Sequence, residues 1–252
     1  MWVDTHCHLY MSSEEPAALL DRAAQVGVDW VMCPGVDLET SLQAAAVANT
    51  HPDSVLWSVG LHPHNAEQWP EEAARIEALA VQAHALGECG LDFYRNLAPR
   101  EAQMTAFREQ LALARALDKP VIIHTRDAFA DVYEMLGDAD LGSRAVLHCW
   151  TAGPKWTKRF RELGATFSFA GPLTYEKGET VRFGAAEAPP ESTMIETDTP
   201  YLTPPPNRAE ANEPANVVRV GEVLASVWGV SIEEVAALTS ATAVRTFGRP
   251  SQ

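Results

Sequence analysis

Residues 120–136 read PVIIHTRDAFADVYEML, and this stretch contains one complete unit of the expected fold. Segment 120–125 is a short apolar run rich in β-branched residues, which is typical of a buried strand, and it reaches a histidine near its end. Segment 126–136 mixes charged residues with spaced apolar ones, which is typical of a helix that covers a sheet. Together the two segments predict one β–α unit.

The same alternation repeats along the whole chain. We expect eight strands, at residues 2–9, 29–36, 55–63, 86–92, 120–125, 145–150, 165–171 and 192–198. We expect helices at residues 16–27, 39–50, 71–85, 99–118, 126–136, 153–163 and 175–183, and two closing helices at about 214–228 and 231–247. This order in 252 residues predicts an α/β fold: a single-domain (β/α)8 TIM barrel over residues 1–252 with C-terminal helices. A doubly wound open sheet is the alternative, but no GxGxxG motif follows the first strand.

Composition narrows the class of protein. The 46% hydrophobic content is enough for a large core, and no apolar run approaches the roughly 20 residues that span a bilayer. The start MWVDTHCHL lacks the positive charge of a signal peptide, and the four cysteines form no CxxC pair. We therefore expect a cytoplasmic protein with reduced thiols. The net charge of −15 argues against a protein that coats nucleic acid through a broad basic surface, but it does not exclude an enzyme that binds one phosphate locally.

Polar residues recur where the expected strands end. They are His6 and His8 in the first strand, His62 and His64 after the third, Glu88 and Asp92 in the fourth, His124 in the fifth, His148 in the sixth, and Glu196 and Asp198 in the eighth. Taken singly, each has a structural explanation, because a lone strand histidine is commonly a hydrogen-bonded core group and an aspartate can cap a turn. Barrel enzymes assemble their sites at the C-terminal ends of the strands, however, so these side chains are expected to converge.

Convergence would be costly without a ligand, because buried polar groups need partners. Imidazole and carboxylate groups suit zinc and neighbouring divalent metals. Four histidines and two carboxylates would provide six ligands, which exceed the needs of one tetrahedral zinc and suit two ions about 3.5–4 Å apart that share a carboxylate. The sequence therefore predicts a dinuclear metal site, with its ligands drawn from strands 1, 4, 5, 6 and 8. The cysteines next to these ligands, Cys7, Cys89 and Cys149, are expected to face the helices as small packing residues.

Eight segments, in order, carry a resemblance to a known family. DTHCHL, GLHPH, GECGLD, VIIHTRDA, VLHCW, FSFAGPLTY, ETDTPYLTP and NEPANV resemble the motif series of TatD-family metal-dependent hydrolases, also described as TatD-type deoxyribonucleases within the amidohydrolase-like barrels. The resemblance runs from residue 3 to about residue 247. It implies the following roles: His6, His8 and Asp198 hold one metal, His124 and His148 hold the other, Glu88 bridges both, His62 and Arg126 face the substrate, and Asp198 takes the proton from the attacking water.

The chain also departs from the family pattern. Tyr10 stands where an aspartate is common, Trp150 where phenylalanine is usual, and Thr242 where an asparagine often precedes the last motif. The segment TAGP replaces a more typical turn after the sixth strand. No departure removes an expected ligand, so the changes bear on the shape of the pocket and on substrate preference rather than on metal binding. Arg208 and Asn212 are expected to organise the loop before the last helices, and Asp92 and Glu196 to support the ligands.

The resemblance implies a hydrolase with two divalent ions, which could be zinc, magnesium, manganese or iron. The expected activity is phosphodiester hydrolysis on DNA, as a deoxyribonuclease with 3'-5' exonuclease action as one form, and Arg126 is placed to bind a phosphate oxygen. One alternative is a metal-dependent ester or amide hydrolase such as an aminoacyl-tRNA deacylase, because fold and ligands alone do not select the bond. Another is a catalytically silent metal-binding scaffold. Nothing in the sequence indicates a membrane or an obligate protein partner.

Overall fold

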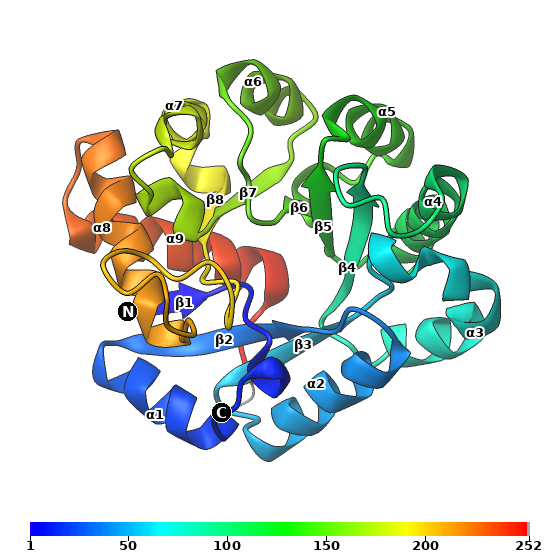
Figure 1. Ribbon diagram of the computed structural model, residues 1–252, viewed down its shortest axis with the longest axis horizontal. Coiled ribbons are helices and arrows are strands. Elements are labelled where there is room, and N and C mark those ends of the chain that lie inside the picture. The colour runs from blue at the N-terminus through cyan, green and yellow to red at the C-terminus, as the bar shows by residue number, and fades with distance from the viewer. Residues whose placement is uncertain (251–252) are drawn as a thin grey trace.

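In a computed structural model that describes residues 1–250, eight parallel strands surround a central axis and helices lie outside them (Figure 1). The strands are β1 (Trp2–Asp4), β2 (Val28–Pro34), β3 (Val55–Val59), β4 (Ala85–Asp92), β5 (Val121–Arg126), β6 (Ala145–Leu147), β7 (Thr166–Phe169) and β8 (Thr193–Ile195). Each strand pairs with the next one along the chain. The ends of the sheet meet where Thr5 N donates to Ile195 O (3.1 Å) and Asp198 N donates to His6 O (2.8 Å). The predicted (β/α)8 barrel is confirmed.

Helices of the expected number follow the strands. They are α1 (Pro16–Gln25), α2 (Leu38–Thr50), α3 (Trp69–Ala80), α4 (Arg100–Ala116), α5 (Phe129–Ala139), α6 (Pro154–Glu162), α7 (Glu179–Glu187), α8 (Val217–Trp228) and α9 (Ile232–Phe247). Short 3-10 turns lie between them: η1 (Leu9–Met11), η2 (Pro63–Gln68), η3 (Gly142–Arg144), η4 (Gly171–Thr174), η5 (Pro190–Ser192) and η6 (Pro214–Asn216). Capping boxes define two helix starts, because Asp37 and Ser231 each accept the backbone N–H three residues on.

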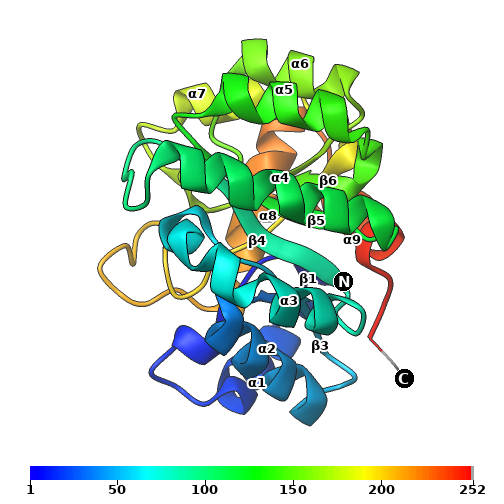
Figure 2. The ribbon, with the colours of Figure 1, turned by 90° about the vertical axis from the view of Figure 1, so that its right-hand side faces the viewer.

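The barrel interior is packed with apolar side chains at the end opposite the C-terminal ends of the strands. Apolar side chains from seven of the strands, such as Met32 and Ile122, form an inner cluster together with Ala243 and Phe247 of α9. Helix α9 therefore closes that end, and Figure 2 shows it on the side of the molecule opposite the loop between β8 and α8. Within residues 1–250 no single helix is long and apolar enough to span a membrane, and η6–α8 with α9 pass that test only as a pair bent by 109°.

Several strands are shorter than the sequence predicts. Strands β1, β6 and β8 each contain three residues, so His6, His8, His148 and Asp198 lie just beyond a strand rather than within it. The backbone leaves the extended conformation there, with φ of 44° at Cys149 and 61° at Asp198. Helix α3 ends at Ala80 instead of continuing to residue 85. At this end of the helix, Lys119 Nζ donates to the carbonyl groups of Ala80 and Val81.

Candidate metal centre and active site

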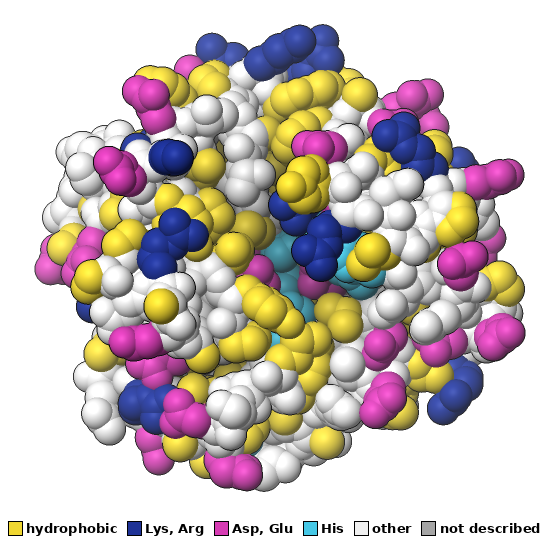
Figure 3. All heavy atoms as spheres, in the orientation of Figure 1, with side chains coloured by type: hydrophobic (Ala, Val, Ile, Leu, Met, Phe, Trp, Pro, Cys, Tyr) yellow, Lys and Arg dark blue, Asp and Glu magenta, His cyan; other side chains and the backbone are white. Residues whose placement is uncertain are grey.

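The polar residues named from the sequence converge at the C-terminal ends of the strands, as predicted. A cavity of about 780 Å³ opens there and is lined by His8, His62, His64, Glu88, Asp92, His124, Arg126, His148 and Asp198, among others. Figure 3 looks into this hollow and shows histidine side chains at its floor with carboxylates beside them. Residues as distant in the sequence as His6 and Asp198 therefore meet in one place.

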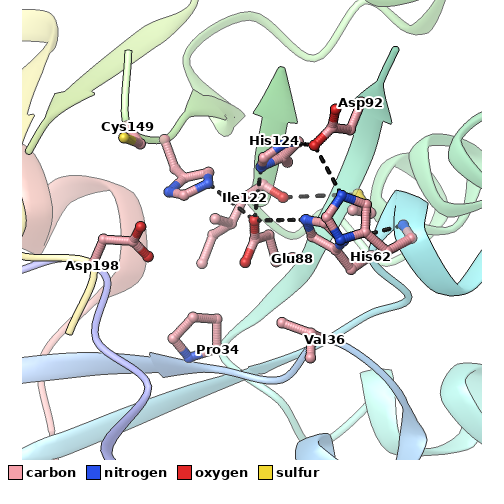
Figure 4. A network of polar contacts seen from close by, with 12 residues as sticks. Pro34, Val36, His62, Glu88, Asp92, Ile122, His124, Cys149 and Asp198 are labelled. Carbon is pink, nitrogen blue, oxygen red and sulfur yellow. Dashed lines mark hydrogen bonds and ion pairs between the residues drawn. The ribbon is translucent and has the colours of Figure 1, made fainter. Parts of the chain in front are cut away.

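Glu88 occupies the centre of the cluster. Its side chain is buried in the middle of β4, and Figure 4 shows it between His62 and Asp198, with His124 above it. Gly87 allows this placement, because it has a φ of 105° and a Cβ there would collide with the carbonyl oxygen of Ile122 on β5. A glycine next to the glutamate is therefore needed for β4 to lie close to β5.

The two carboxylate oxygens of Glu88 face different sets of imidazoles. Oε1 lies near His148 Nε2 (3.0 Å), His124 Nδ1 (3.2 Å) and His62 Nε2 (3.4 Å). Oε2 lies near His6 Nε2 (3.3 Å) and His8 Nε2 (3.6 Å). This division is what a carboxylate shared between two cations requires.

Asp198 completes the second set. Its Oδ1 lies 3.7 Å from His6 Nε2 and 3.6 Å from His8 Nε2, and these two nitrogens are 3.1 Å apart. Donor atoms of His6, His8 and Asp198 all lie within 4.8 Å of one another, and so do those of His62, Glu88 and His124. The second group includes His62, which the sequence resemblance places on the substrate side, so its ring stands beside the ligand cluster as well as in the cavity.

Three of these histidines are oriented by an acceptor on the far side of the ring. The pairs are His8 Nδ1 with Pro34 O (3.1 Å), His124 Nε2 with Asp92 Oδ2 (3.2 Å) and His148 Nδ1 with Glu196 Oε1 (3.0 Å). Because a carbonyl or carboxylate oxygen only accepts, each of these ring nitrogens carries a proton and donates it. The expected supporting roles of Asp92 and Glu196 thus agree with the geometry.

The hydrogen-bonding pattern fits a bound cation. In the neutral rings of His8, His124 and His148, the nitrogen that faces Glu88 has a lone pair, and a lone pair facing a carboxylate oxygen is repulsive. Charging all the rings instead would bury several imidazolium groups together, which is expensive. A divalent cation between nitrogen and oxygen removes the conflict, since both are its normal ligands. The donor set therefore fits divalent metal.

The electrostatics of the cluster favour an ionised Glu88 carboxylate. Burial alone would raise the pKa of Glu88, but the imidazoles of His148 and His62 outweigh it and hold that pKa well below its usual range. Burial lowers the pKa of His62 to about 4, so this ring is neutral at pH 7. Glu88 therefore stays ionised, and an ionised carboxylate among imidazole nitrogens attracts positive charge.

Two arginines line one side of the cavity, and only one of them was expected. Arg126 is the last residue of β5, and its guanidinium carbon lies 4.0 Å from the centre of the Tyr94 ring. Arg95 follows β4 and lines the same cavity. Among residues 1–250 neither guanidinium has a carboxylate within 4.0 Å. Sequence reasoning missed Arg95; its only signal was its position three residues after Asp92, at the end of a strand.

Asp4 is a further residue that the sequence analysis did not use. Its Oδ1 accepts from Thr197 N (2.9 Å) and His6 N (3.2 Å), and its Oδ2 accepts from Thr197 Oγ1 (2.6 Å). It therefore ties the segment after β1 to the segment after β8, and these segments carry His6 and Asp198. The signal available in the sequence was a charged residue inside an apolar strand.

Other expectations for the cavity lining need correction or refinement. Cys7 and Cys89 are buried as expected, but Cys149 lines the cavity, because the chain has already left β6 and the alternation of strand side chains no longer applies. Trp150 is buried and donates from Nε1 to Thr157 Oγ1 (2.9 Å), so it packs behind the site. Tyr10 Oη contacts His8 Nδ1 (3.1 Å) and donates to Pro34 O (2.8 Å), so it helps to fix the position of the His8 ring.

Comparisons with known proteins agree with this geometry. The family model described as TatD related DNase matches residues 3–248. Curated relatives include the metal-dependent hydrolase YcfH of Escherichia coli strain K12, 35% identical over 97% of this chain and 95% of that protein, and YabD of Bacillus subtilis, 32% identical over 98% and 99%. Another relative, from a Rahnella species, is named 3'-5' ssDNA/RNA exonuclease TatD and is 35% identical over 91% of this chain and 90% of that protein.

A solved structure shows the same architecture. The crystal structure of YjjV, a TatD homolog from Escherichia coli, has a TM-score of 0.92 and 28% sequence identity, and the match covers 99% of this chain and 98% of that one. The match of fold therefore extends over nearly the whole barrel, and the family match spans every residue of the histidine–carboxylate cluster. The chain belongs to the TatD-related DNase family and is a metal-dependent hydrolase of that family.

Proposed function

We propose that this protein is a dinuclear metal-dependent phosphodiesterase that acts on nucleic acid. The proposal assigns His6, His8 and Asp198 to one ion and His124 and His148 to the other, with Glu88 between them. The opposite orientation of the two Glu88 oxygens supports this division. The relative named as a 3'-5' ssDNA/RNA exonuclease supports a nucleic-acid substrate.

The observation that favours phosphate over a carboxylic ester or amide is the pair of guanidinium groups. Within residues 1–250, Arg95 and Arg126 face the cavity without a carboxylate partner, in a protein whose net charge is −15. A guanidinium donates two parallel hydrogen bonds to phosphate oxygens and stays charged at all relevant pH values. The stacking of Arg126 on Tyr94 limits the orientations of its side chain. A phosphate held here would lie between the arginines and the histidine–carboxylate cluster.

The protein groups can then be given roles. When bound, divalent ions supply Lewis-acid polarisation of the phosphoryl oxygen and activation of the attacking water. Asp198 Oδ1 faces the His6–His8 pair at the cavity edge, where its carboxylate accepts the proton of the water. Arg126 and Arg95 offset the charge that develops on the phosphate. His62, beside Glu88 and neutral at pH 7, orients the substrate.

Hydrolysis assays on purified protein test the proposal. The protein is stripped with a chelator, reloaded separately with zinc, manganese or magnesium, and offered end-labelled single-stranded and double-stranded oligonucleotides beside panels of esters and amides. Asp198→Asn, purified in the same way, reports contaminating nuclease. Metal-dependent cleavage of oligonucleotides that Asp198→Asn abolishes supports the proposal. Turnover of esters or amides with no cleavage of phosphodiesters contradicts it.

A further inference from the structure

The cavity has two unlike walls. Arg95, on the loop after β4, and Arg126, at the end of β5, form the cationic wall. The opposite wall, here called the apolar shelf, consists of Met11, Pro172, Tyr201 and Leu202. Figure 3 shows Lys or Arg side chains on one side of the hollow and hydrophobic ones on the other, with the histidines between them. A substrate in this cavity therefore meets positive charge on one side and an apolar surface on the other.

The apolar shelf is held rigidly to the metal centre. Tyr201 N donates to Asp198 O (2.8 Å), and Asn212 Nδ2 donates to Tyr201 O (2.7 Å). In η1, after β1, Met11 N donates to His8 O (2.9 Å), and the Tyr201 hydroxyl contacts Met11 Sδ at 3.7 Å. Each of these shelf residues is thus anchored to the backbone of a proposed ligand.

Close packing of two loops holds the remaining part of the shelf. Gly171 of η4 lies against the backbone of Leu202, and a Cβ at this position would collide with the Leu202 carbonyl oxygen. This approach places Pro172 beside Leu202. The shelf is therefore a built surface and not a chance exposure of single side chains.

Folding does not explain the exposure of the Tyr201 ring. The residue is 55% exposed, although it sits on a loop that Asn212 clamps and next to a buried site. A large aromatic side chain that stays open to a cavity is a normal feature of ligand sites. Its flat face suits another flat group, and base–aromatic stacking is the common way in which proteins bind single-stranded nucleic acid.

We propose that the apolar shelf is a nucleobase subsite, in which the base attached to the reacting phosphate stacks on Tyr201 while Arg95 and Arg126 hold the phosphate. This inference rests on the proposed function and deepens it. It makes the rate depend on whether one nucleotide, the one next to the reacting phosphate, carries a base. None of the four shelf side chains offers the paired donors and acceptors that would distinguish one base from another. The subsite thus recognises the presence of a base rather than its identity.

An abasic scan tests the subsite. A single abasic residue is moved along a short single-stranded oligonucleotide, and kcat/KM is measured at each position with the metal-loaded protein. We expect a loss of between about fivefold and about 100-fold at one position, next to the cleaved bond, from the usual contribution of one stacked base. Equal rates at every position of the abasic residue overturn the proposal.

Variants assign the effect to the shelf. Tyr201→Ala is expected to abolish the difference between base and abasic substrate, and Tyr201→Phe to keep it, because the phenyl ring still stacks. Phe183→Ala on α7 is the matched control, since Phe183 is also 55% exposed but does not line the cavity. An undiminished preference for the base in Tyr201→Ala, or its equal loss in Phe183→Ala, contradicts the assignment.

A binding measurement separates this inference from the proposed function. The dissociation constant is measured for the same oligonucleotides with a phosphorothioate at the linkage next to the scanned residue, so that hydrolysis is slow. If the protein cleaves no phosphodiester yet binds the base-containing oligonucleotide more tightly than the abasic one through Tyr201, the proposed function fails and the subsite stands. Equal dissociation constants in the wild-type protein overturn the subsite whatever the activity.

Discussion

Replacing Asp92 by alanine should weaken one of the two proposed metal sites and spare the other. The buried carboxylate of Asp92 accepts from His124 Nε2 (3.2 Å) and from His64 Nε2 (2.9 Å), and its Oδ1 accepts from Arg95 N (2.8 Å). The first of these bonds keeps the proton on Nε2 and points Nδ1 toward Glu88 Oε1. Without it, His124 can rotate or change tautomer, and the ring no longer presents a fixed lone pair.

The expected loss of metal affinity can be taken from the usual effect of removing the acceptor behind a ligating histidine. Loss of the acceptor behind a ligating histidine typically lowers metal affinity 10- to 100-fold, which corresponds to about 1.4 to 2.8 kcal/mol. Only the site that contains His124 should change, because His8 is oriented separately by Pro34 O. Tyr10→Phe is the complementary variant, since Tyr10 Oη contacts His8 Nδ1 and leaves the His124 site untouched.

Competition of the protein with a chromogenic zinc chelator measures the two binding steps. In Asp92→Ala we expect one step to weaken within the stated range and the other to match the wild type, and in Tyr10→Phe a smaller effect on the opposite step. Two unchanged steps in Asp92→Ala would refute the orienting role of this carboxylate. Equal weakening of both steps would refute the separation of the two sites.

Four other predictions concern the proposed metal centre, the cavity and the stability of the fold. Asp198→Asn should keep the fold and most of the metal but lower turnover sharply, and wild-type kcat in this variant excludes Asp198 as the proton acceptor. Arg126→Ala and Arg95→Ala should each raise KM for oligonucleotides, or lower kcat/KM, with unchanged metal content by elemental analysis; loss of metal would mean that the arginines support the centre instead. Removal of metal should lower the melting temperature, because free metal at about 100 times Kd stabilises the folded state by about 2.7 kcal/mol, and an unchanged melting temperature after chelation would show that the cluster binds no metal. Lys119→Met should lower the free energy of unfolding by about 1.5–3 kcal/mol in urea titrations, because Nζ donates to the carbonyl groups after α3, and activity of the folded variant should not change.

The convergence of the histidine–carboxylate cluster could be predicted from sequence because it follows simple geometric rules. Parallel strands end on one face of the barrel, so a histidine or carboxylate near the end of a buried strand reaches that face, as His124 does on β5. Glu88 lies in the middle of β4, and its carboxylate is 3.2 Å from His124 Nδ1. The rule fails once the chain leaves the strand. Cys149 was expected to face the helices, but it follows β6 with a positive φ and lines the cavity instead.

Residues on the cavity walls could not be predicted in the same way. Arg95 and Tyr201 lie on loops, whose paths depend on contacts distant in sequence, such as that of Gly171 with Leu202. Neither an isolated arginine nor an isolated tyrosine has a pattern that marks its direction. The hydrogen-bonding role of Asp4 was likewise hidden, because its main partner Thr197 lies at the other end of the barrel sequence.

The central claim is that two cations flank the Glu88 carboxylate. The most direct measurement is anomalous diffraction at the absorption edge of the metal, on crystals of protein reloaded with zinc or manganese. We expect two peaks about 3.5–4 Å apart, one beside Oε2 with His6, His8 and Asp198 and one beside Oε1 with His124 and His148. A single peak, or peaks away from Glu88, would contradict it.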